Sequence, residues 1–328
     1  MILPTTPAAR LQRLRTALSL VEVLVVIAIV AILIGLILAA VQKVREAANN
    51  TRCGNNLRQI GLAIQHDHDT HQRFPSGGWG WSWVGMADRG TGPEQPGGWL
   101  YNILPYVEQG VIRRMGAGER SPKLEETVLS QLSMPLPVFT CPSRRGGGPY
   151  QADGRAYFVG VGPTRDTVTV YPTQLARTDY AGNAGSQGFN EIFGGPATLT
   201  EGDSLSYPWP NTAACTGIFF QRSQVTLNGV TRGTSNTILV GERYVRPESY
   251  QTGGDVGDNE AMYVGFDNDV YRVTIAPPER DRTGYDNSRI FGSAHPAGVN
   301  MLYCDGSVRR VAYNVDPDVF FDEGRRMP

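Results

Sequence analysis

The sequence has almost no net charge and lacks the short motifs that mark common enzymes. Its 328 residues include 31 acidic and 30 basic side chains, so the formal net charge is −1. A protein that binds nucleic acid usually has a strongly basic surface. No HExxH pair and no GxSxG turn occurs, so the usual signs of a zinc protease or a serine hydrolase are absent. We therefore expect a protein that is not an enzyme and has no nucleic-acid partner.

Cysteine is also scarce. The four cysteines, Cys53, Cys141, Cys215 and Cys304, are far apart, and no CxxC pair gives the spacing of a zinc knuckle. In an exported protein, four cysteines can form disulfides in three alternative pairings. We favour a bond between Cys53 and Cys141, which would join the N-terminal helical region to the rest of the chain. Buried thiols are the alternative.

The most prominent feature that is present is a long apolar run near the N-terminus. Within Leu18–Gln42 only Glu22 is ionisable, and Val23–Val41 gives 19 uncharged residues in a row. At about 1.5 Å per residue this helix spans about 29 Å, close to the ~30 Å hydrocarbon core of a bilayer. A secretory signal peptide has a shorter apolar core, of about 7–15 residues. The run therefore predicts a single membrane-spanning helix.

The charges before this run predict its orientation. Arg10, Arg13 and Arg15 precede the apolar segment with no acidic residue among them. Positive residues tend to stay on the cytoplasmic side of a membrane. We therefore expect a single-pass protein of the inner (cytoplasmic) membrane, with its N-terminus in the cytoplasm and its main domain outside.

Glu22 needs an explanation, because a carboxylate inside a membrane-length apolar segment is costly and usually functional. The basic leader, the apolar helix and the glutamate resemble the N-terminus of type IV pilins and pseudopilins. In that family a prepilin peptidase removes the leader, the new N-terminal residue is methylated, and a glutamate is fifth in the mature chain. The resemblance implies cleavage between Ala17 and Leu18, although the family prefers Gly and Phe at these positions. Glu22 would then be fifth and would pair with the free amine of a neighbouring subunit.

Beyond the membrane segment, the pattern predicts more helix and then mostly strands. Apolar residues recur at helical spacing through 43–72, with a candidate break at Gly54. We expect a short helix at 99–112 interrupted at Pro105, and another that Ser121 caps with Pro122 in its first turn. A hairpin is expected with Asp305-Gly306 as a two-residue turn. The other expected strands are 137–140, 167–171, 217–220, 236–244 and 270–275.

These elements predict an α+β architecture, in which a long N-terminal transmembrane and stalk helix precedes a pilin-like head. The head is expected to be a mainly antiparallel β-sheet with short helices. The predicted regions are a leader at 1–17, a transmembrane segment at 18–42, a stalk helix at 43–72 that continues into the head, and an extracytoplasmic head at 73–328.

Six blocks of the chain carry a second, more specific resemblance. They are CGNNLRQIGLA (Cys53–Ala63), LPYVEQ (Leu104–Gln109), FTCPS (Phe139–Ser143), DYAGNAG (Asp179–Gly185), GTSNTILVGER (Gly233–Arg243) and SAHPAGVNMLYCDGSVR (Ser293–Arg309). In the last block nine residues separate His295 from Asp305-Gly306, which is the spacing of a C-terminal family signature. On these blocks the chain resembles the pilin-like family of planctomycete-type bacteria known as domain of unknown function 1559. The resemblance implies the fold and the location of the protein, but no reaction.

Three further groups of residues could contact a ligand. An acidic, Gly-spaced loop could hold calcium, although its spacing is not that of an EF-hand, and an ordinary solvated turn is the alternative. We expect the histidines near the end of the stalk helix to be hydrogen-bonded residues, and the tryptophans to be core or subunit contacts. No other cofactor is expected. The residues are Asp255, Asp258, Asp267 and Asp269 for calcium, His66, His68 and His71, and Trp79, Trp81, Trp83 and Trp99.

Together these features predict a membrane-anchored, pilin-like or pseudopilin-like structural subunit. We expect it to assemble through its N-terminal helix with other pilin-like subunits, into a type IV pilus or a type II secretion-type filament, with Glu22 as the assembly residue. The alternative is an extracytoplasmic head that binds a solute or a carbohydrate and is held by a pilin-type membrane anchor.

Overall fold

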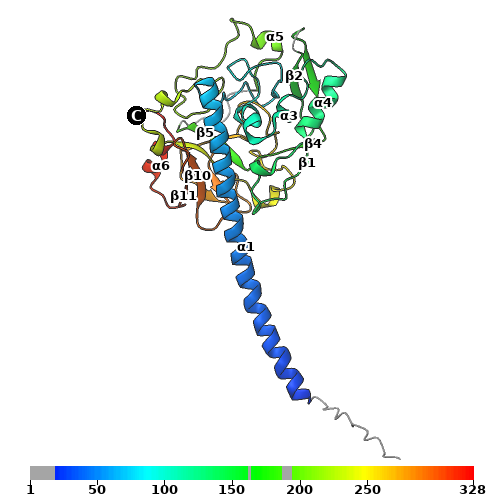
Figure 1. Cartoon of the computed structure of the whole chain (residues 1–328), viewed down its shortest axis with the longest axis vertical. Helices are drawn as coiled ribbons and strands as arrows, with labels where there is room; N and C mark the ends of the chain where they lie inside the picture. Colours follow the sequence, from blue (N-terminus) through cyan, green and yellow to red (C-terminus); the bar gives the residue numbers. More distant parts are fainter. Residues whose placement is uncertain (1–18, 162–163, 187–193) are drawn as a thin grey trace, which may run out of the picture. The chain divides into compact units, whose positions relative to one another are not determined.

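The computed structural model describes residues 19–161, 164–186 and 194–328, and the chain divides into two units, Met1–Ala47 and Ala48–Pro328. One helix, α1 (Leu20–His71), contributes residues to both units (Figure 1). The predicted cleavage site between Ala17 and Leu18 lies outside the described residues.

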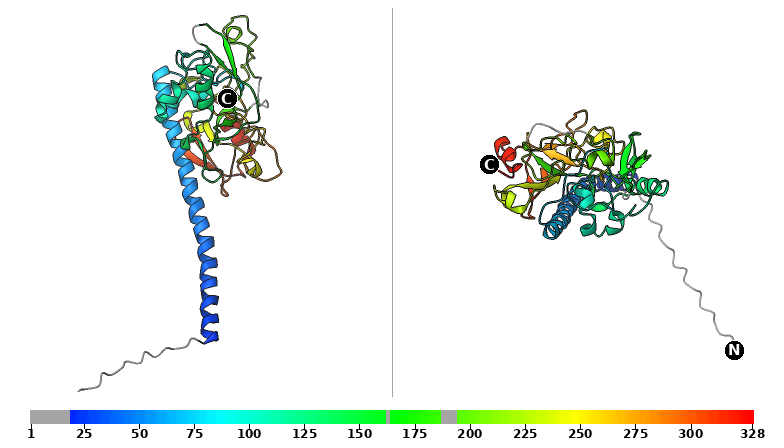
Figure 2. Two further views of the ribbon diagram at one scale, coloured as in Figure 1. Left: turned by 90° about the vertical axis from the view of Figure 1, so that its right-hand side faces the viewer. Right: turned by 90° about the horizontal axis from the view of Figure 1, so that it is seen from above.

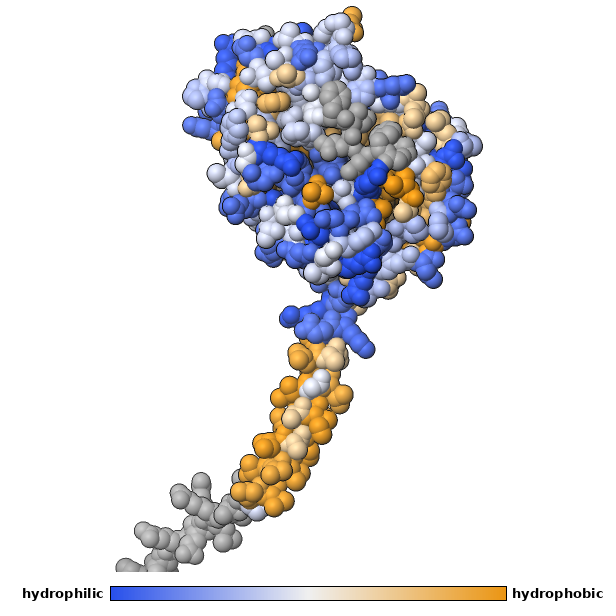
Figure 3. Space-filling model, turned by 180° about the vertical axis from the view of Figure 1, so that it is seen from behind, coloured by the Kyte–Doolittle hydropathy of each residue, from blue (hydrophilic) through white to orange (hydrophobic). Residues whose placement is uncertain are grey.

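In the first unit, α1 is a helix of exposed apolar side chains. A stretch of this helix is long and apolar enough to cross a membrane, and none of that stretch is buried. Leu24, Ile32 and Leu38 are 56%, 64% and 60% exposed. Apolar side chains cover the visible face of this part of the helix (Figure 3). The structure therefore contains a helix with the length and composition of a membrane span, as the sequence predicts.

After Ala48, α1 packs into the core of the second unit and runs along one side of it (Figure 2). Cys53, Leu57, Ile60 and Ile64 follow helical spacing on one face and are fully buried. The expected break at Gly54 is wrong, because the helix is continuous there. A glycine inside a helix costs only about 1 kcal/mol relative to alanine, and the buried side chains on either side outweigh that cost.

A five-stranded sheet lies at the centre of the second unit. Its strand order is β11-β10-β6-β5-β7, and all neighbours pair antiparallel except β5 and β7, which are parallel. Helix α1 lies close to β10, since a Cβ added at Gly61 would come within 2.8 Å of Leu302 Cδ1. The strands are β5 (Tyr180–Gly185), β6 (Ile238–Glu242), β7 (Tyr271–Val273), β10 (Val299–Tyr303) and β11 (Val308–Val311).

Short elements complete the second unit, and the mainly antiparallel α+β prediction is confirmed. The pairs β1 (Tyr150–Gln151) with β4 (Gln174–Leu175) and β2 (Tyr157–Gly160) with β3 (Thr167–Val170) are antiparallel, whereas β8 (Glu279–Arg280) and β9 (Gly292–Ser293) are parallel. The short α-helices are α2 (Trp99–Asn102), α3 (Gly110–Arg113), α4 (Lys123–Leu132), α5 (Leu199–Gly202) and α6 (Pro317–Glu323). The 3₁₀ turns are η1 (Leu104–Val107), η2 (Pro137–Phe139), η3 (Leu227–Gly229), η4 (Thr234–Asn236) and η5 (Pro247–Ser249).

Several expected local elements are wrong in detail. The segment 99–112 forms three short turns, α2, η1 and the start of α3, in place of one interrupted helix. Pro122, not Ser121, occupies the N-cap position of α4, with no side-chain cap. The expected strand 137–140 is instead the turn η2 (Pro137–Phe139) followed by Thr140, because Pro135 and Pro137 lack the backbone donors that a ladder needs. Residues 217–220 lie outside the named strands, although Ile218 and Phe219 both donate to the carbonyl of Asn183.

The predicted hairpin is present with a longer turn than expected. Strands β10 and β11 pair from Val299 with Val311 to Leu302 with Val308. Tyr303 N–H donates to the carbonyl of Ser307, and Gly306 N–H donates to the carbonyl of Tyr303. Gly306 has φ +83°, whereas Asp305 is not at positive φ. The connection is therefore the three-residue type with one left-handed glycine, not a two-residue turn with two positive φ angles.

The tryptophans belong to the core, as expected. Trp79, Trp83 and Trp99 are 1% exposed or less, and Trp81 is partly buried. The rings of Trp79 and Trp83 meet edge to face with their centroids 5.0 Å apart, which is a favourable aromatic geometry.

Candidate functional site

The exposed apolar helix has a defined start at Ser19 and Glu22. The N–H of Ser19 donates to Glu22 Oε2 at 2.8 Å, and the N–H of Glu22 donates to Ser19 Oγ at 3.2 Å. This reciprocal pair is a capping box, which provides acceptors for backbone N–H groups that have no hydrogen-bond partner within the first turn of a helix. We did not predict this capping box, although Ser-x-x-Glu before an apolar run is its sequence signature. Glu22 therefore has a role inside its own helix, whether or not it also contacts a neighbour.

A second candidate site is a buried polar cluster in the second unit. We call Cys53, Cys141, Glu242 and His295 the thiol–histidine cluster. Each of these residues is 1% exposed or less. One donor atom from each lies within 4.8 Å of the donor atoms of the other three. The four residues come from α1, from the segment after η2, from the end of β6 and from the segment between β9 and β10, so the fold itself assembles the cluster.

The imidazole of His295 contacts two of the other members of the cluster, Glu242 and Cys141. His295 Nε2 lies 3.2 Å from Glu242 Oε1 and 3.8 Å from Cys141 Sγ. The Sγ atoms of Cys53 and Cys141 are 3.0 Å apart. The structure thus brings together the two cysteines that we favoured as a disulfide pair, and the bond itself stays a prediction. Local sequence spacing could not reveal the cluster, since Cys53 and Cys141 are 88 residues apart and Cys141 and His295 are 154 apart.

Burial and mutual contacts shift the pKa values within the cluster. Burial lowers the pKa of His295, but its hydrogen bonds to Cys141 and Glu242 and the charge of Glu242 outweigh burial and raise that pKa to about 11. Burial raises the pKa of Glu242, but the hydrogen bond and charge of His295 hold it below its usual value. The hydrogen bond with Cys53, together with burial, holds the pKa of the Cys141 thiol well above its usual range. Without a bound cation, the cluster therefore holds an imidazolium–carboxylate pair beside a protonated thiol.

Neighbouring groups hold these side chains in position. Asn300 N–H donates to Glu242 Oε2 at 2.8 Å, and Cys141 N–H donates to Asp179 Oδ2 at 2.7 Å. The hydroxyl of Tyr313 donates to the carbonyl of His295 at 2.5 Å. Hydrogen bonds from such outer groups orient buried polar side chains and reduce the cost of burying them.

Asp179 connects the cluster to a network of buried ion pairs. Arg145 Nη2 lies 2.7 Å from Asp179 Oδ1, and Arg145 Nη1 lies 2.7 Å from Asp258 Oδ2. Arg144 Nε lies 2.8 Å from Asp281 Oδ2. Removing one partner of a buried pair leaves an uncompensated charge, at a cost of about 3–5 kcal/mol. These arginines therefore fix the segments that follow Cys141.

The blocks that carry the family resemblance meet at this place in the fold. Cys53 belongs to CGNNLRQIGLA, Cys141 to FTCPS, Glu242 to GTSNTILVGER and His295 to SAHPAGVNMLYCDGSVR. Asp179, from DYAGNAG, accepts the hydrogen bond from the backbone of Cys141. Five of the six blocks thus contribute to one buried polar centre.

The residues of the C-terminal signature have separate roles. His295 belongs to the thiol–histidine cluster. Asp305 is exposed and accepts hydrogen bonds from Ser307 N–H at 2.9 Å and from Ser307 Oγ at 2.6 Å. Gly306 supplies the left-handed residue of the turn. The signature therefore joins a buried polar residue to a hairpin turn.

The predicted calcium residues are buried, so the alternative of a solvated turn is wrong. Arg145 and Arg243 both pair with Asp258, and Arg243 Nη1 lies 3.4 Å from Asp269 Oδ1. Asp267 and Asp269 lie together with Glu260 in a buried group whose carboxylate oxygens are within 4.8 Å of one another. Calcium binding stays a prediction, because arginines already compensate part of the acidic charge around this group. The four residues, each 2% exposed or less, are Asp255, Asp258, Asp267 and Asp269.

The histidines near the end of α1 have different partners. His66 stacks against the ring of Tyr106, and His68 accepts a backbone hydrogen bond at 3.3 Å. His71 Nδ1 lies 3.2 Å from Asp67 Oδ1. These contacts agree with packed and hydrogen-bonded residues at a helix end, as the sequence analysis expected.

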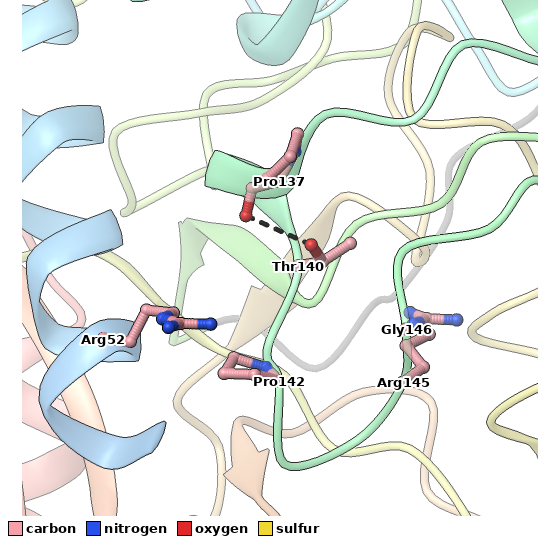
Figure 4. A pocket seen from close by; sticks show the side chains of 6 residues that line it. All are labelled: Arg52, Pro137, Thr140, Pro142, Arg145 and Gly146. Atoms are coloured by element: carbon pink, nitrogen blue, oxygen red, sulfur yellow. Dashed lines mark hydrogen bonds between the residues drawn. The ribbon is translucent and has the colours of Figure 1, made fainter. Parts of the chain in front are cut away.

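An open hollow lies on the surface beside the segments that carry the two clustered cysteines (Figure 4). Arg52 directly precedes Cys53 in the chain, and Thr140 and Pro142 flank Cys141. Ion pairs with two aspartates already engage the Arg145 guanidinium at this hollow. The hollow is lined by Arg52, Pro137, Thr140, Pro142, Arg145 and Gly146, a set with few groups for orienting a small molecule.

Comparison with known proteins identifies the family of the chain. Searches of curated proteins and of solved structures both found no match. A family model described as "Protein of unknown function (DUF1559)" matches residues 42–318, which is most of the 328-residue chain and includes the whole thiol–histidine cluster. The chain therefore belongs to the DUF1559 family of proteins of unknown function.

Proposed function

We propose that this protein is a membrane-anchored, pilin-like structural subunit that assembles through the N-terminal part of α1. The observation that carries the proposal is the exposed apolar surface of that segment, which bears a single carboxylate at its start. An exposed apolar helix of this length needs either lipid or other helices around it. The helix of a pilin-type subunit is surrounded by lipid while it anchors the protein in the membrane, and by other helices once the subunit is part of a filament.

Small residues along α1 support close packing between such helices. Ala28, Ala31, Gly35 and Ala39 follow spacings of three and four residues, so they share one face of the helix. A Cβ added at Gly35 would meet no atom within 4 Å. Small residues at this spacing let the backbones of membrane helices approach each other. This face is therefore a suitable contact for a second pilin-like subunit.

The location and processing of the protein follow from the same proposal. The leader would stay in the cytoplasm, a prepilin peptidase would cut after Ala17, and the second unit would lie outside the inner membrane. Assembly into a type IV pilus or a type II secretion-type filament would then bring the Leu18 amine of one subunit to Glu22 of another. The proposed role has no catalytic step.

The alternative of a carbohydrate-binding or solute-binding domain has less support. Trp79, Trp83 and Trp99 are buried and so cannot stack on a sugar from solvent. The hollow beside Arg52 is open, and two of the polar side chains that line it, Thr140 and Arg145, already have partners within the protein.

Photocrosslinking in membranes tests the proposed assembly. A photoreactive amino acid replaces Ile32, which is 64% exposed, or Leu62, which is 58% exposed and lies in the second unit as a control position. We expect the Ile32 position to give adducts between subunits, identified by mass spectrometry as this chain or another chain with a pilin-type leader. Gly35→Leu should reduce their yield, because added bulk separates the helices. Val26→Leu adds bulk on the opposite face and should reduce the yield less.

Adducts from the Ile32 position to lipid alone, at an abundance where the protein is fully inserted, would contradict assembly through this helix. The segment would then be a plain membrane anchor.

A further inference from the structure

We propose that Cys53, Cys141, Glu242 and His295 bind a divalent cation of the zinc type, which fastens α1 to the central sheet. Two thiols, one imidazole and one carboxylate are all ligand types that zinc accepts. The sulfur and nitrogen donors disfavour calcium and magnesium, which prefer oxygen. The site is independent of the assembly role proposed above.

The distances within the cluster suit one small cation. Zinc binds sulfur at about 2.3 Å and nitrogen or oxygen at about 2.0–2.2 Å, so tetrahedral ligands are roughly 3.3–3.8 Å from each other. His295 Nε2 lies 3.2 Å from Glu242 Oε1 and 3.8 Å from Cys141 Sγ. All four donor atoms lie within 4.8 Å of one another. Small movements of the two thiols, now 3.0 Å apart, would complete the tetrahedron.

Binding of a divalent cation would leave only a small net charge in the cluster. Two thiolates and the Glu242 carboxylate carry three negative charges, and a divalent ion with a neutral imidazole leaves one of them. The charge of the buried Arg144 guanidinium also acts on Glu242, although Arg144 pairs directly with Asp281 and Asp179. Binding releases one proton from each thiol and one from the imidazolium.

The outer contacts match those of a structural metal site. The backbone of Asn300 holds one oxygen of Glu242, so the other oxygen faces His295. Asp179 accepts from the backbone of Cys141, and Tyr313 holds the backbone of His295. Such outer hydrogen bonds orient metal ligands. Because all four positions are protein side chains and all are buried, the site is structural and leaves no open position for a reaction.

Metal analysis of the full-length protein tests the site. The chain is extracted from membranes in detergent without chelators, and bound metals are measured by plasma mass spectrometry. We expect about one zinc per chain in the wild type, and at least a tenfold loss in Cys141→Ser and His295→Gln. Cys215→Ser and Cys304→Ser change buried thiols outside the cluster and should keep the metal.

A second measurement on the unchanged protein avoids variants that fail to fold. The protein is denatured with a chelator and alkylated without a reductant. A metal site predicts that all four cysteines react, and that cobalt added to metal-free protein gives thiolate-to-cobalt absorption. Cys53 and Cys141 that react only after reduction would show a disulfide and overturn the proposal. Four reactive thiols with neither zinc nor a cobalt spectrum would overturn it as well.

Discussion

Ser19 and Glu22 cap each other at the start of α1, with the N–H of Ser19 2.8 Å from Glu22 Oε2 and the N–H of Glu22 3.2 Å from Ser19 Oγ. The lone carboxylate of the apolar run therefore has a role that needs no second subunit. The pilin-type interpretation gives it a further role between subunits. A carboxylate has two oxygens and accepts several hydrogen bonds, so the two roles are compatible. Substitutions can separate them.

Glu22→Gln should remove the charge and keep the capping box, because glutamine also serves at this position of the box. If Glu22 pairs with the amine of a neighbour, this variant should insert normally and assemble poorly, since the amine loses its counter-charge. Ser19→Ala should do the opposite, weakening the helix start by about 0.5–2 kcal/mol while keeping the charge. Filament recovery and crosslinking, compared at equal membrane abundance, measure the difference. Glu22→Ala, which removes both roles, should assemble least.

Equal assembly of wild type and Glu22→Gln, with a defect in Ser19→Ala, would assign Glu22 to the cap alone. That result would remove the main electrostatic argument for a pilin-type filament.

Processing of the leader is a second prediction, and it rests on the amino-acid sequence alone. The mature chain should begin at Leu18 with a methylated amine, because the basic leader and apolar helix resemble a prepilin peptidase substrate. Intact-mass analysis of membrane material checks this. Ala17→Gly, which restores the residue that the family prefers, should be processed at least as completely. Finding only the unprocessed chain in both proteins would refute the prediction.

The sequence predicts well those features that repeat along the chain. The apolar run predicts the exposed part of α1, and helical spacing through Leu57, Ile60 and Ile64 predicts its buried part. The run of strand-forming residues at 236–244 predicts β6, and Asp305-Gly306 between two such runs predicts the hairpin of β10 and β11. Local propensity fails where tertiary contacts decide, as at Gly54, where a glycine stays helical because its neighbours are buried.

The buried polar cluster could not be predicted in the same way. Cys53, Cys141, Glu242 and His295 come together only when four distant segments pack, and no local spacing records that contact. Their only shared sign in the sequence is that each lies in a different block of the family resemblance. The favoured pairing of Cys53 with Cys141 identified half of the group, but the histidine and the carboxylate needed the fold.

The turn between β10 and β11 gives a third prediction. Gly306 has φ +83°, and a Cβ there would come within 2.7 Å of Gln65 Nε2. Gly306→Val should lower the free energy of unfolding by about 1–3 kcal/mol, because a β-branched residue fits poorly in the left-handed region. Gly306→Asn should cost less, since asparagine tolerates that conformation. Thermal unfolding of the full chain in detergent, followed by tryptophan fluorescence, measures the change.

Gly90→Val is the matched control for this experiment. Gly90 has an ordinary φ and no atom within 4 Å of an added Cβ, so the substitution should be nearly neutral. Similar losses in Gly306→Val and Gly90→Val would mean that the backbone conformation of the turn is not the cause.

Asp67, on the buried face of α1, gives a prediction of pH dependence. Its side chain is 1% exposed and lies 3.2 Å from His71 Nδ1. Burial raises the pKa of Asp67 to about 6, although the charges of His71, Arg73 and Arg113 oppose the shift. The unfolded value is about 3.9. Between these two pH values the folded state keeps a proton that the unfolded state releases, so the contribution of Asp67 to stability is lost as the pH rises from about 4 through about 6.

Asp67→Asn should therefore gain stability relative to the wild type across this range. The expected gain is on the order of 2–3 kcal/mol between pH 4 and pH 7, because a shift of about two pKa units corresponds to about that free energy. The difference between the two proteins is the quantity to measure, since buried carboxyls with lowered pKa values, such as Asp179, act in the opposite direction in both. Asp69→Asn, an exposed change on the same helix, serves as the control. Its stability relative to the wild type should not change between pH 4 and pH 7. Parallel stability curves for wild type and Asp67→Asn from pH 4 to pH 7 would show that burial does not hold the proton on this side chain.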